Sequence, residues 1–325
     1  MHRFALMKWA VSLPFGPFAA LAAALGASGA GCGSGSPPPT SAFSLGPASA
    51  VKISSDIASP YDAAPTADGR TIYFTATGSQ GPGVYRAAPG GPPAVVFAGA
   101  PLAFPFAVAV ADGAGKVFVA DPGAEPSDGV TGGVYAIPLA GGAPALVAGS
   151  AGFIAAGLAV ASNKLYVAGV SADGVPGLYA ADVAGGALAA VASGAPFLDP
   201  SGIAVKSPGE IYVADDGGGS ARVLRVSGAS TSVLVSDIAV GYPAGIALSP
   251  DETALFVSAL DARGAGDAVL RVALATGHVD STTAGIDQFV DPAGLHRASD
   301  APVYAWADTT ANGTGTVLVF GNDQP

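Results

Sequence analysis

Short apolar runs separated by turn-forming residues recur along most of the chain. Residues 200–228 give the clearest case, because the runs GIAV, EIYVAD and RVLRV are divided by Gly, Pro, Ser and Asp, and TSVLVS follows at 231–236. Each run is short, rich in Val, Ile and Tyr, and bounded by turn formers, as half-buried antiparallel strands are. The pattern predicts a unit of four consecutive β-strands.

This unit repeats from residue 60 onward. An inner strand, led by Pro in five of six copies, begins near residues 60, 105, 155, 200, 243 and 292. Every second strand carries one aromatic residue, which we interpret as packing between blades: Tyr73, Phe118, Tyr166, Tyr212, Phe256 and Tyr304. Repeats of 40–50 residues with four strands each are typical of β-propellers. The sequence therefore predicts an all-β, six-bladed β-propeller of four-stranded antiparallel blades over residues 48–325.

The sixth unit has only three strands, ending at Phe320. Its missing fourth strand is predicted at the other end of the domain, where residues 48–61 match residues 230–243 and share the run Ser-Asp-Ile-Ala. An N-terminal strand that pairs into the last blade would close the ring and remove its exposed sheet edges.

Residues 1–31 have the order of a secretory leader. A charged start with Arg3 and Lys8 precedes an apolar run over 9–25 and then small residues. The only cysteine, Cys32, follows. The segment resembles bacterial lipoprotein signals, in which a small residue precedes a cysteine that becomes lipidated, although Gly29 stands where that family usually has Leu.

The resemblance implies a signal peptide over residues 1–31 and a lipid anchor on Cys32. Gly33 differs from the Asp that retains lipoproteins at the inner membrane, which favours the outer membrane and periplasm. The alternative is ordinary cleavage near residues 27–30, with Cys32 left as a free thiol. Residues 32–47 are rich in Gly, Ser and Pro and are predicted to be a tether.

Composition narrows the classes of partner. The chain is 50% hydrophobic and 11% charged, and loss of Arg3 and Lys8 with the leader would take its net charge from −11 to −13. An acidic chain without a basic cluster is a poor nucleic-acid binder, and we expect contact with a membrane only through the lipid anchor. A single cysteine excludes an intramolecular disulfide and a multi-cysteine zinc site. We expect a monomer.

Several blades resemble known propeller families. The runs PSGIAV, EIYVAD and RVLRV resemble NHL-type blades, and residues 66–76 and 249–259 resemble those of TolB-like propellers. The resemblance covers residues 48–320. It implies architecture and leaves function open, since propellers host many unrelated activities.

Acidic residues concentrate in one class of loops. In a four-stranded antiparallel blade, the loops from second to third strand and the loops between blades emerge on the same face. These loops carry 14 acids against one base, Arg263: Asp56, Asp121, Glu125, Asp128, Asp173, Asp199, Asp215, Asp216, Asp237, Asp261, Asp267, Asp287, Asp291 and Asp308. Two interpretations stand. The face binds something cationic, such as Ca²⁺, another divalent ion or a basic protein patch, or its aspartates are ordinary turn residues that aid solubility.

Individual side chains sharpen these interpretations. Asp199 and Asp291 each precede the Pro of an inner strand and are expected near the channel mouth. The aspartates that end second strands, Asp121, Asp215 and Asp308, are expected singly to accept backbone N–H bonds in turns. His296 stands where the other inner strands have alanine, so it is either a channel ligand or base, or a packed rim residue.

Catalytic signatures are mostly missing: the sequence has no GxSxG, HExxH, P-loop or helix-opening GxGxxG. Lactonases of the SMP-30 type share the predicted fold and place Asn or Asp after the inner-strand Pro, but none of those positions here is a carboxylate or amide. The sequence favours a non-catalytic, envelope-anchored binding propeller without a cofactor, which recognises a protein or small ligand. One alternative is a metal-dependent hydrolase or lactonase of SMP-30-like type that uses channel-mouth carboxylates such as Asp62, Asp199 and Asp291. Another is a scaffold within a larger envelope assembly.

Overall fold

The computed structural model describes residues 49–51, 53, 56–217, 220–259, 268–282, 292–310 and 313–321. They fall within one compact unit that spans residues 42–325. The predicted leader, the tether and Cys32 lie outside the described residues, as do Asp261, Asp267, Asp287 and Asp291. Among the described residues, no helix has the length and apolar character needed to cross a bilayer.

The first three blades follow the predicted order of inner to outer strand. Blade 1 has β3 (Ala63–Pro65), β4 (Ile72–Gly78), β5 (Gly81–Ala87) and β6 (Ala94–Ala98), with the short β2 (Ile57–Ala58) added beside β4. Blade 2 has β7 (Ala107–Ala111), the 3₁₀ turn η1 (Asp112–Ala114), β8 (Lys116–Asp121), β9 (Gly133–Pro138) and β10 (Ala145–Leu146). Blade 3 has β11 (Ile154–Ala161), β12 (Lys164–Val170), β13 (Pro176–Asp182) and β14 (Ala189–Ser193).

The other three blades repeat the arrangement. Blade 4 has β15 (Pro200–Ser207), β16 (Glu210–Asp216), β17 (Ala221–Ser227) and β18 (Ser230–Ile238). Blade 5 has β19 (Ile246–Leu248), β20 (Ala254–Ala259), β21 (Ala268–Ala273) and β22 (Val279–Thr282). Blade 6 has β23 (Pro292–Arg297), β24 (Tyr304–Asp308) and β25 (Thr316–Phe320), with β1 (Ser49–Ala50) as its outermost strand.

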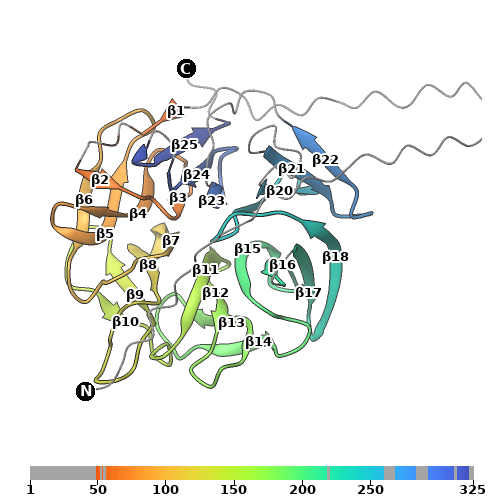
Figure 1. Cartoon of the computed structure of the whole chain (residues 1–325), viewed down its shortest axis with the longest axis horizontal. Helices are drawn as coiled ribbons and strands as arrows, with labels where there is room; N and C mark the ends of the chain where they lie inside the picture. Colours follow the sequence, from red (N-terminus) through yellow and green to blue (C-terminus); the bar gives the residue numbers. More distant parts are fainter. Residues whose placement is uncertain are drawn as a thin grey trace, which may run out of the picture. The chain divides into compact units, whose positions relative to one another are not determined.

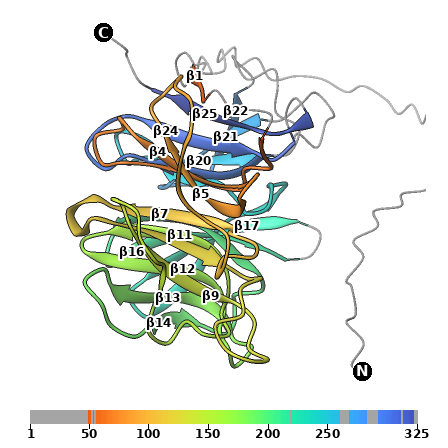
Figure 2. The ribbon, with the colours of Figure 1, turned by 90° about the vertical axis from the view of Figure 1, so that its left-hand side faces the viewer.

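The blades form a ring around a central channel. Each inner strand contacts the next in the order β3, β7, β11, β15, β19 and β23, and β23 contacts β3 again. Figure 1 shows the sheets around this common centre, and in the side view of Figure 2 blades 5 and 6 lie at the top and blade 3 at the bottom. The predicted all-β, six-bladed propeller is confirmed.

The core lies between neighbouring sheets. The aromatic residue of every second strand is at most 4% exposed, as for Tyr212 between blades 4 and 5 and Phe256 between blades 5 and 6. Burying one such ring contributes roughly 1.5–3 kcal/mol. These aromatics pack between blades, as the sequence predicts.

The N-terminal strand pairs with the last blade over a short ladder. Ser49 faces Val319 and Ala50 faces Leu318 in antiparallel register, and the N–H of Val51 donates to the carbonyl of Val317 at 2.8 Å. The chain then crosses to blade 1, where β2 pairs with β4. Closure of the ring by the whole N-terminal segment stays a prediction.

Candidate functional site

The six inner strands share a six-residue motif that begins at residues 60, 105, 155, 200, 243 and 292. Its third position is Gly in blades 3 to 6 and Ala107 in blade 2, but Asp62 in blade 1. Its fifth position is Ala in blades 1 to 5, but His296 in blade 6. The two departures belong to blades that are neighbours in the ring, because β23 contacts β3.

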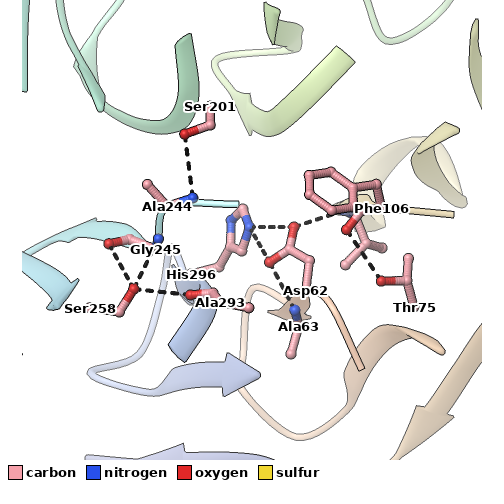
Figure 3. A network of polar contacts seen from close by, with 11 residues as sticks. Asp62, Ala63, Thr75, Phe106, Ser201, Ala244, Gly245, Ser258, Ala293 and His296 are labelled. Carbon is pink, nitrogen blue, oxygen red and sulfur yellow. Dashed lines mark hydrogen bonds and ion pairs between the residues drawn. The ribbon is translucent and has the colours of Figure 1, made fainter. Parts of the chain in front are cut away.

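These two side chains meet inside the channel (Figure 3). Nε2 of His296 lies 3.0 Å from both carboxylate oxygens of Asp62. The carboxylate also accepts the N–H of Ala63 at 2.9 Å and that of Val108, in blade 2, at 2.8 Å. The side chain of Asp62 is 2% exposed and that of His296 is 15% exposed. A buried carboxylate is stable only with such hydrogen bonds and a partner that can carry positive charge.

Close approach of the inner strands makes room for this pair. A Cβ added to Gly294 would lie 1.8 Å from Oδ1 of Asp62, and one added to Gly157 would lie 1.3 Å from the carbonyl oxygen of Ser201. The glycine at the third position therefore lets each inner strand pack directly against the next blade. In blade 1 the same position supplies a carboxylate that reaches across to blades 2 and 6.

Hydroxyl groups make further bonds between blades (Figure 3). The hydroxyl of Ser258, in β20, donates to the carbonyl of Ala293 in blade 6 at 3.0 Å and accepts the N–H of Gly245 at 2.9 Å. Thr75 holds the equivalent position in β4 and donates to the carbonyl of Phe106 in blade 2 at 3.4 Å. The polar side chains in the channel therefore join blades to one another.

One end of the channel is open. The fifth and sixth motif positions of all six blades line a cavity of about 260 Å³, which also touches Ser162, Glu252 and Ser299 in the turns between first and second strands. Nη1 of Arg297, the sixth residue of its motif, donates to the carbonyl of Ser249 at 3.0 Å and lies 3.8 Å from Oε1 of Glu252. The cavity thus opens on the face of these turns, opposite the acidic loops.

Aromatic rings close the other end. Phe106 and Tyr61, at the second motif position of blades 2 and 1, have ring centroids 5.4 Å apart, and Phe104 contacts both. Tyr242 comes from the loop between blades 4 and 5, and its ring lies 5.3 Å from that of Phe106. Since blades 2 and 5 are opposite in the ring, this contact crosses the channel axis. We call Tyr61, Phe104, Phe106 and Tyr242 the aromatic cap.

Asp199 lies beside the cap. The hydroxyl of Tyr242 donates to Oδ1 of Asp199 at 3.3 Å. Partial burial raises the pKa of Asp199, and the nearby charges of Asp216 and Asp215 add to this, while the bond from Tyr242 acts in the opposite direction. Partial burial and the charge of Asp199 likewise raise the pKa of Tyr242. The phenol therefore stays protonated as a donor.

The three aspartates that end second strands are fully buried. Asp121 accepts the backbone N–H groups of Ala103, Phe104 and Gly123, and burial raises its pKa. Asp308 accepts the N–H of Thr310 at 3.1 Å. The bonds from Gly123 and Thr310 are local turn contacts of the kind that the sequence predicts, whereas those from Ala103 and Phe104 come from the loop before β7.

Asp215 has an additional partner. Its carboxylate accepts the N–H groups of Leu198 and Asp199 and forms an ion pair with Arg222, whose Nη2 lies 2.7 Å from Oδ2. Arg222 belongs to β17 and so does not enter a count of loop residues. One of the acids assigned to this face is therefore neutralised locally.

Asp291, which the sequence places near the channel mouth with Asp199, lies outside the described residues. Among the residues that the structure describes, no three His, Cys, Asp or Glu side chains gather as metal ligands would. Asp62, a candidate ligand for the hydrolase, is instead bonded to His296. Sequence reasoning missed the aromatic cap, although Tyr61 and Phe106 stand where the other blades have Ala or Ser.

Comparisons with known proteins agree with the fold. No protein-family model and no curated protein matches the chain. The PQQ-bound aldose sugar dehydrogenase from Streptomyces coelicolor superposes with a TM-score of 0.61 at 12% identity, covering 84% of this chain and 98% of that one. A gluconolactonase from Xanthomonas campestris gives 0.55 at 16% identity, with 81% and 86% covered.

A putative TolB from Agrobacterium tumefaciens gives a TM-score of 0.54 at 14% identity, covering 82% of this chain and 91% of that one. Such identities show the fold alone. The TolB neighbour agrees with the sequence resemblance at this level, and the range of neighbours, from enzymes to a TolB protein, leaves the function open.

Proposed function

We propose that the protein is a non-catalytic binding propeller whose acidic loop face recognises cationic side chains of a protein partner. This face consists of the loops between second and third strands and the loops between blades. The observation that carries the proposal is the aromatic cap, which lies at the centre of the face beside the carboxylates of Asp199 and Asp216.

The cap offers exposed ring surface. Phe104 is 40% exposed and Tyr242 is 43% exposed, and Leu198, next to Asp199, is 57% exposed. Ile154 and Val175, also exposed, lie at the same face. Apolar patches rimmed by polar groups mark interaction sites on soluble proteins, and aromatic residues are enriched in them. The loop face therefore combines apolar contact area with negative charge.

A Lys or Arg side chain suits this combination. A cation over the face of a Tyr or Phe ring gains about 0.5–2 kcal/mol, depending on how far it is desolvated. A carboxylate beside the ring adds a charge-assisted hydrogen bond, and Asp199 already lies within 3.3 Å of the Tyr242 hydroxyl. The exposed acids of the surrounding loops, such as Glu125, Asp128 and Asp173, would steer a basic partner toward the cap.

The same proposal places the propeller in the cell envelope. It is exported, held through lipid on Cys32 at the outer membrane, and carried clear of the surface by residues 33–47. Mass spectrometry of the protein purified from membranes tests this part: we expect a lipid-modified N-terminal cysteine, and an unmodified cysteine or a mature chain that begins elsewhere contradicts it.

Isothermal titration with a hexalysine peptide tests the binding face, with hexaglutamate as the control peptide. We expect saturable binding of hexalysine that weakens as salt is raised, because exposed charges are screened. Replacing Tyr242 and Phe104 together by leucine keeps apolar volume and removes the rings, and Asp199→Asn removes the charge. Each change is expected to weaken binding severalfold.

Val233→Ala is the matched control, because Val233 is 51% exposed on the outer strand β18, away from the cap. It is expected to leave hexalysine binding unchanged. Equal affinity for hexalysine and hexaglutamate, or full affinity in the Tyr242 and Phe104 variant, contradicts recognition by this face.

A further inference from the structure

The open end of the channel has a polar side and an apolar side. At the fifth motif position, five blades contribute alanine and only blade 6 contributes a polar group, His296. At the sixth position, five blades contribute Pro, Val or Leu and only blade 6 contributes a charge, Arg297. Strand β23 thus supplies the only polar side chains at these two positions, and the other five inner strands supply apolar side chains there.

His296 is oriented by its bond to Asp62. Because Nε2 contacts the carboxylate, Nδ1 is the ring nitrogen left for another partner, and no hydrogen bond to it forms among the described residues. The ring lines the open cavity. Both ring nitrogens donate when the ring is protonated, and the buried carboxylate of Asp62 is the partner that such a cation requires.

Arg297 supplies a second donor group. Successive side chains of a strand point to opposite faces, so His296 reaches toward blade 1 and Arg297 toward blade 5. The guanidinium uses Nη1 for the carbonyl of Ser249, while Glu252, itself 47% exposed, stays 3.8 Å from that nitrogen. Arginine has five N–H donors in all. It therefore retains capacity for an anionic ligand.

The size and closure of the cavity limit what fits. Its volume of about 260 Å³ lies just below the usual range of about 300–1,000 Å³ for ligand pockets, and the aromatic cap closes the channel at the other end. Apolar side chains from five blades and two polar side chains from blade 6 give the cavity two chemically different sides. The occupant that matches is small, with an apolar body and one anionic head.

We propose that this cavity binds a small carboxylate, with the carboxyl group against His296 and Arg297 and the apolar body against the inner strands of blades 1 to 5. The site is at the end of the channel opposite the acidic loop face and does not depend on the function proposed for that face. Glu252 opposes an anion only weakly, because it is partly exposed and therefore screened by solvent.

Isothermal titration of the full chain with sodium benzoate tests the proposal, and benzyl alcohol serves as a neutral probe of similar shape. We expect benzoate to bind at least about tenfold more tightly than benzyl alcohol, as one charge-assisted hydrogen bond predicts. His296→Ala and Arg297→Leu give each position an apolar residue that other blades have there. Each variant is expected to lose roughly tenfold in benzoate affinity.

Two further variants separate loss of the site from loss of the fold. Ala159→Leu fills the cavity and keeps both polar side chains, so it is expected to abolish benzoate binding. Arg70→Ala removes a base that is 87% exposed and is expected to change nothing. The circular dichroism of each variant is compared with that of the parent chain. Absence of benzoate binding at millimolar concentration, equal binding of benzyl alcohol, or unchanged binding in Arg297→Leu and Ala159→Leu overturns the proposal.

Discussion

Replacing Asp62 and His296 by alanine, singly and together, measures how strongly this pair joins blade 6 to blade 1. The two blades are neighbours in the ring, and the chain joins them only through the short segment between β1 and β2, so their junction depends largely on non-covalent contacts. Alanine already occupies the fifth motif position in five blades and the third position in blade 2. Alanine is therefore compatible with the inner strand at both positions. The loss in free energy of unfolding then reflects mainly the lost contact between Asp62 and His296.

The expected magnitudes follow from what each change leaves behind. His296→Ala leaves the carboxylate of Asp62, 2% exposed, with backbone donors only. Loss of a hydrogen bond to a charged group costs about 1.5–3 kcal/mol, and because the Asp62 side chain is only 2% exposed we expect about 3 kcal/mol. Asp62→Ala leaves the N–H groups of Ala63 and Val108 without their acceptor, at about 1–3 kcal/mol each, so we expect about 4 kcal/mol.

The double variant is the decisive comparison. It has no unpaired charge and retains only the cost of the two backbone donors, so we expect about 4 kcal/mol rather than the roughly 7 kcal/mol of the two single changes together. The coupling energy is then about 3 kcal/mol, at the upper end of values for residues in contact. A double-mutant cycle isolates this coupling energy when each single substitution removes the contact between the two side chains and creates no new one.

Urea unfolding followed by circular dichroism and by tryptophan fluorescence provides the free energies, with Trp306 in β24 as a buried reporter of blade 6. Agreement of the two probes checks that unfolding is two-state. If the destabilisation of the double variant equals the sum of the two single variants within about 0.5 kcal/mol, Asp62 and His296 act independently, and the idea that this pair joins blade 6 to blade 1 is refuted.

Three further predictions concern the rest of the fold. Hydrogen bonds from Ser249 and Thr253 lower the pKa of Asp251 from 3.8 to about 2, so their stabilisation is present above pH 3.8 and is lost as the pH falls toward 2. Between pH 5 and pH 2 the urea midpoint of Asp251→Asn is therefore expected to fall less than that of the parent chain, and an equal fall contradicts this. Calcium at millimolar concentration is expected to leave the thermal midpoint unchanged, whereas a rise that Asp199→Asn abolishes would establish a metal site on the loop face. Removal of residues 1–53 is expected to lower the thermal midpoint more than removal of residues 1–47, because only the longer truncation deletes β1, and equal midpoints argue against closure by this strand.

The fold was predictable because its signals are local and repeated. Each strand is a short run of β-branched and aromatic residues between turn formers, and the six copies support one another even where a single copy is ambiguous. The buried aromatic of each second strand could be predicted for the same reason. The turn bonds of Asp121 also follow from a local preference of aspartate.

The candidate sites depend on contacts between residues far apart in the chain. Asp62 and His296 are 234 residues apart, and nothing local to either predicts the other. What the sequence does contain is a pair of departures from the repeat, at the third position of one blade and the fifth of its neighbour. The ion pair of Asp215 with Arg222 was missed for a different reason, since a count restricted to loops leaves out a base that lies in a strand.

The aromatic cap makes the two ends of the channel independent. Tyr61 and Phe106 occupy the second motif position in adjacent blades, where the other four blades have Ala or Ser. Their rings therefore extend toward the channel axis from the same side of the ring of blades. Tyr242 enters from the opposite side and contacts Phe106. A cation at the loop face and a carboxylate at the open cavity are thereby separated by packed rings rather than by a continuous water-filled path. Variants of Tyr242 and Phe104 are therefore expected to weaken hexalysine binding and leave benzoate binding intact. Arg297→Leu is expected to weaken benzoate binding and leave hexalysine binding intact. Loss of both activities in either variant would show that the cap is not the barrier that its ring contacts indicate.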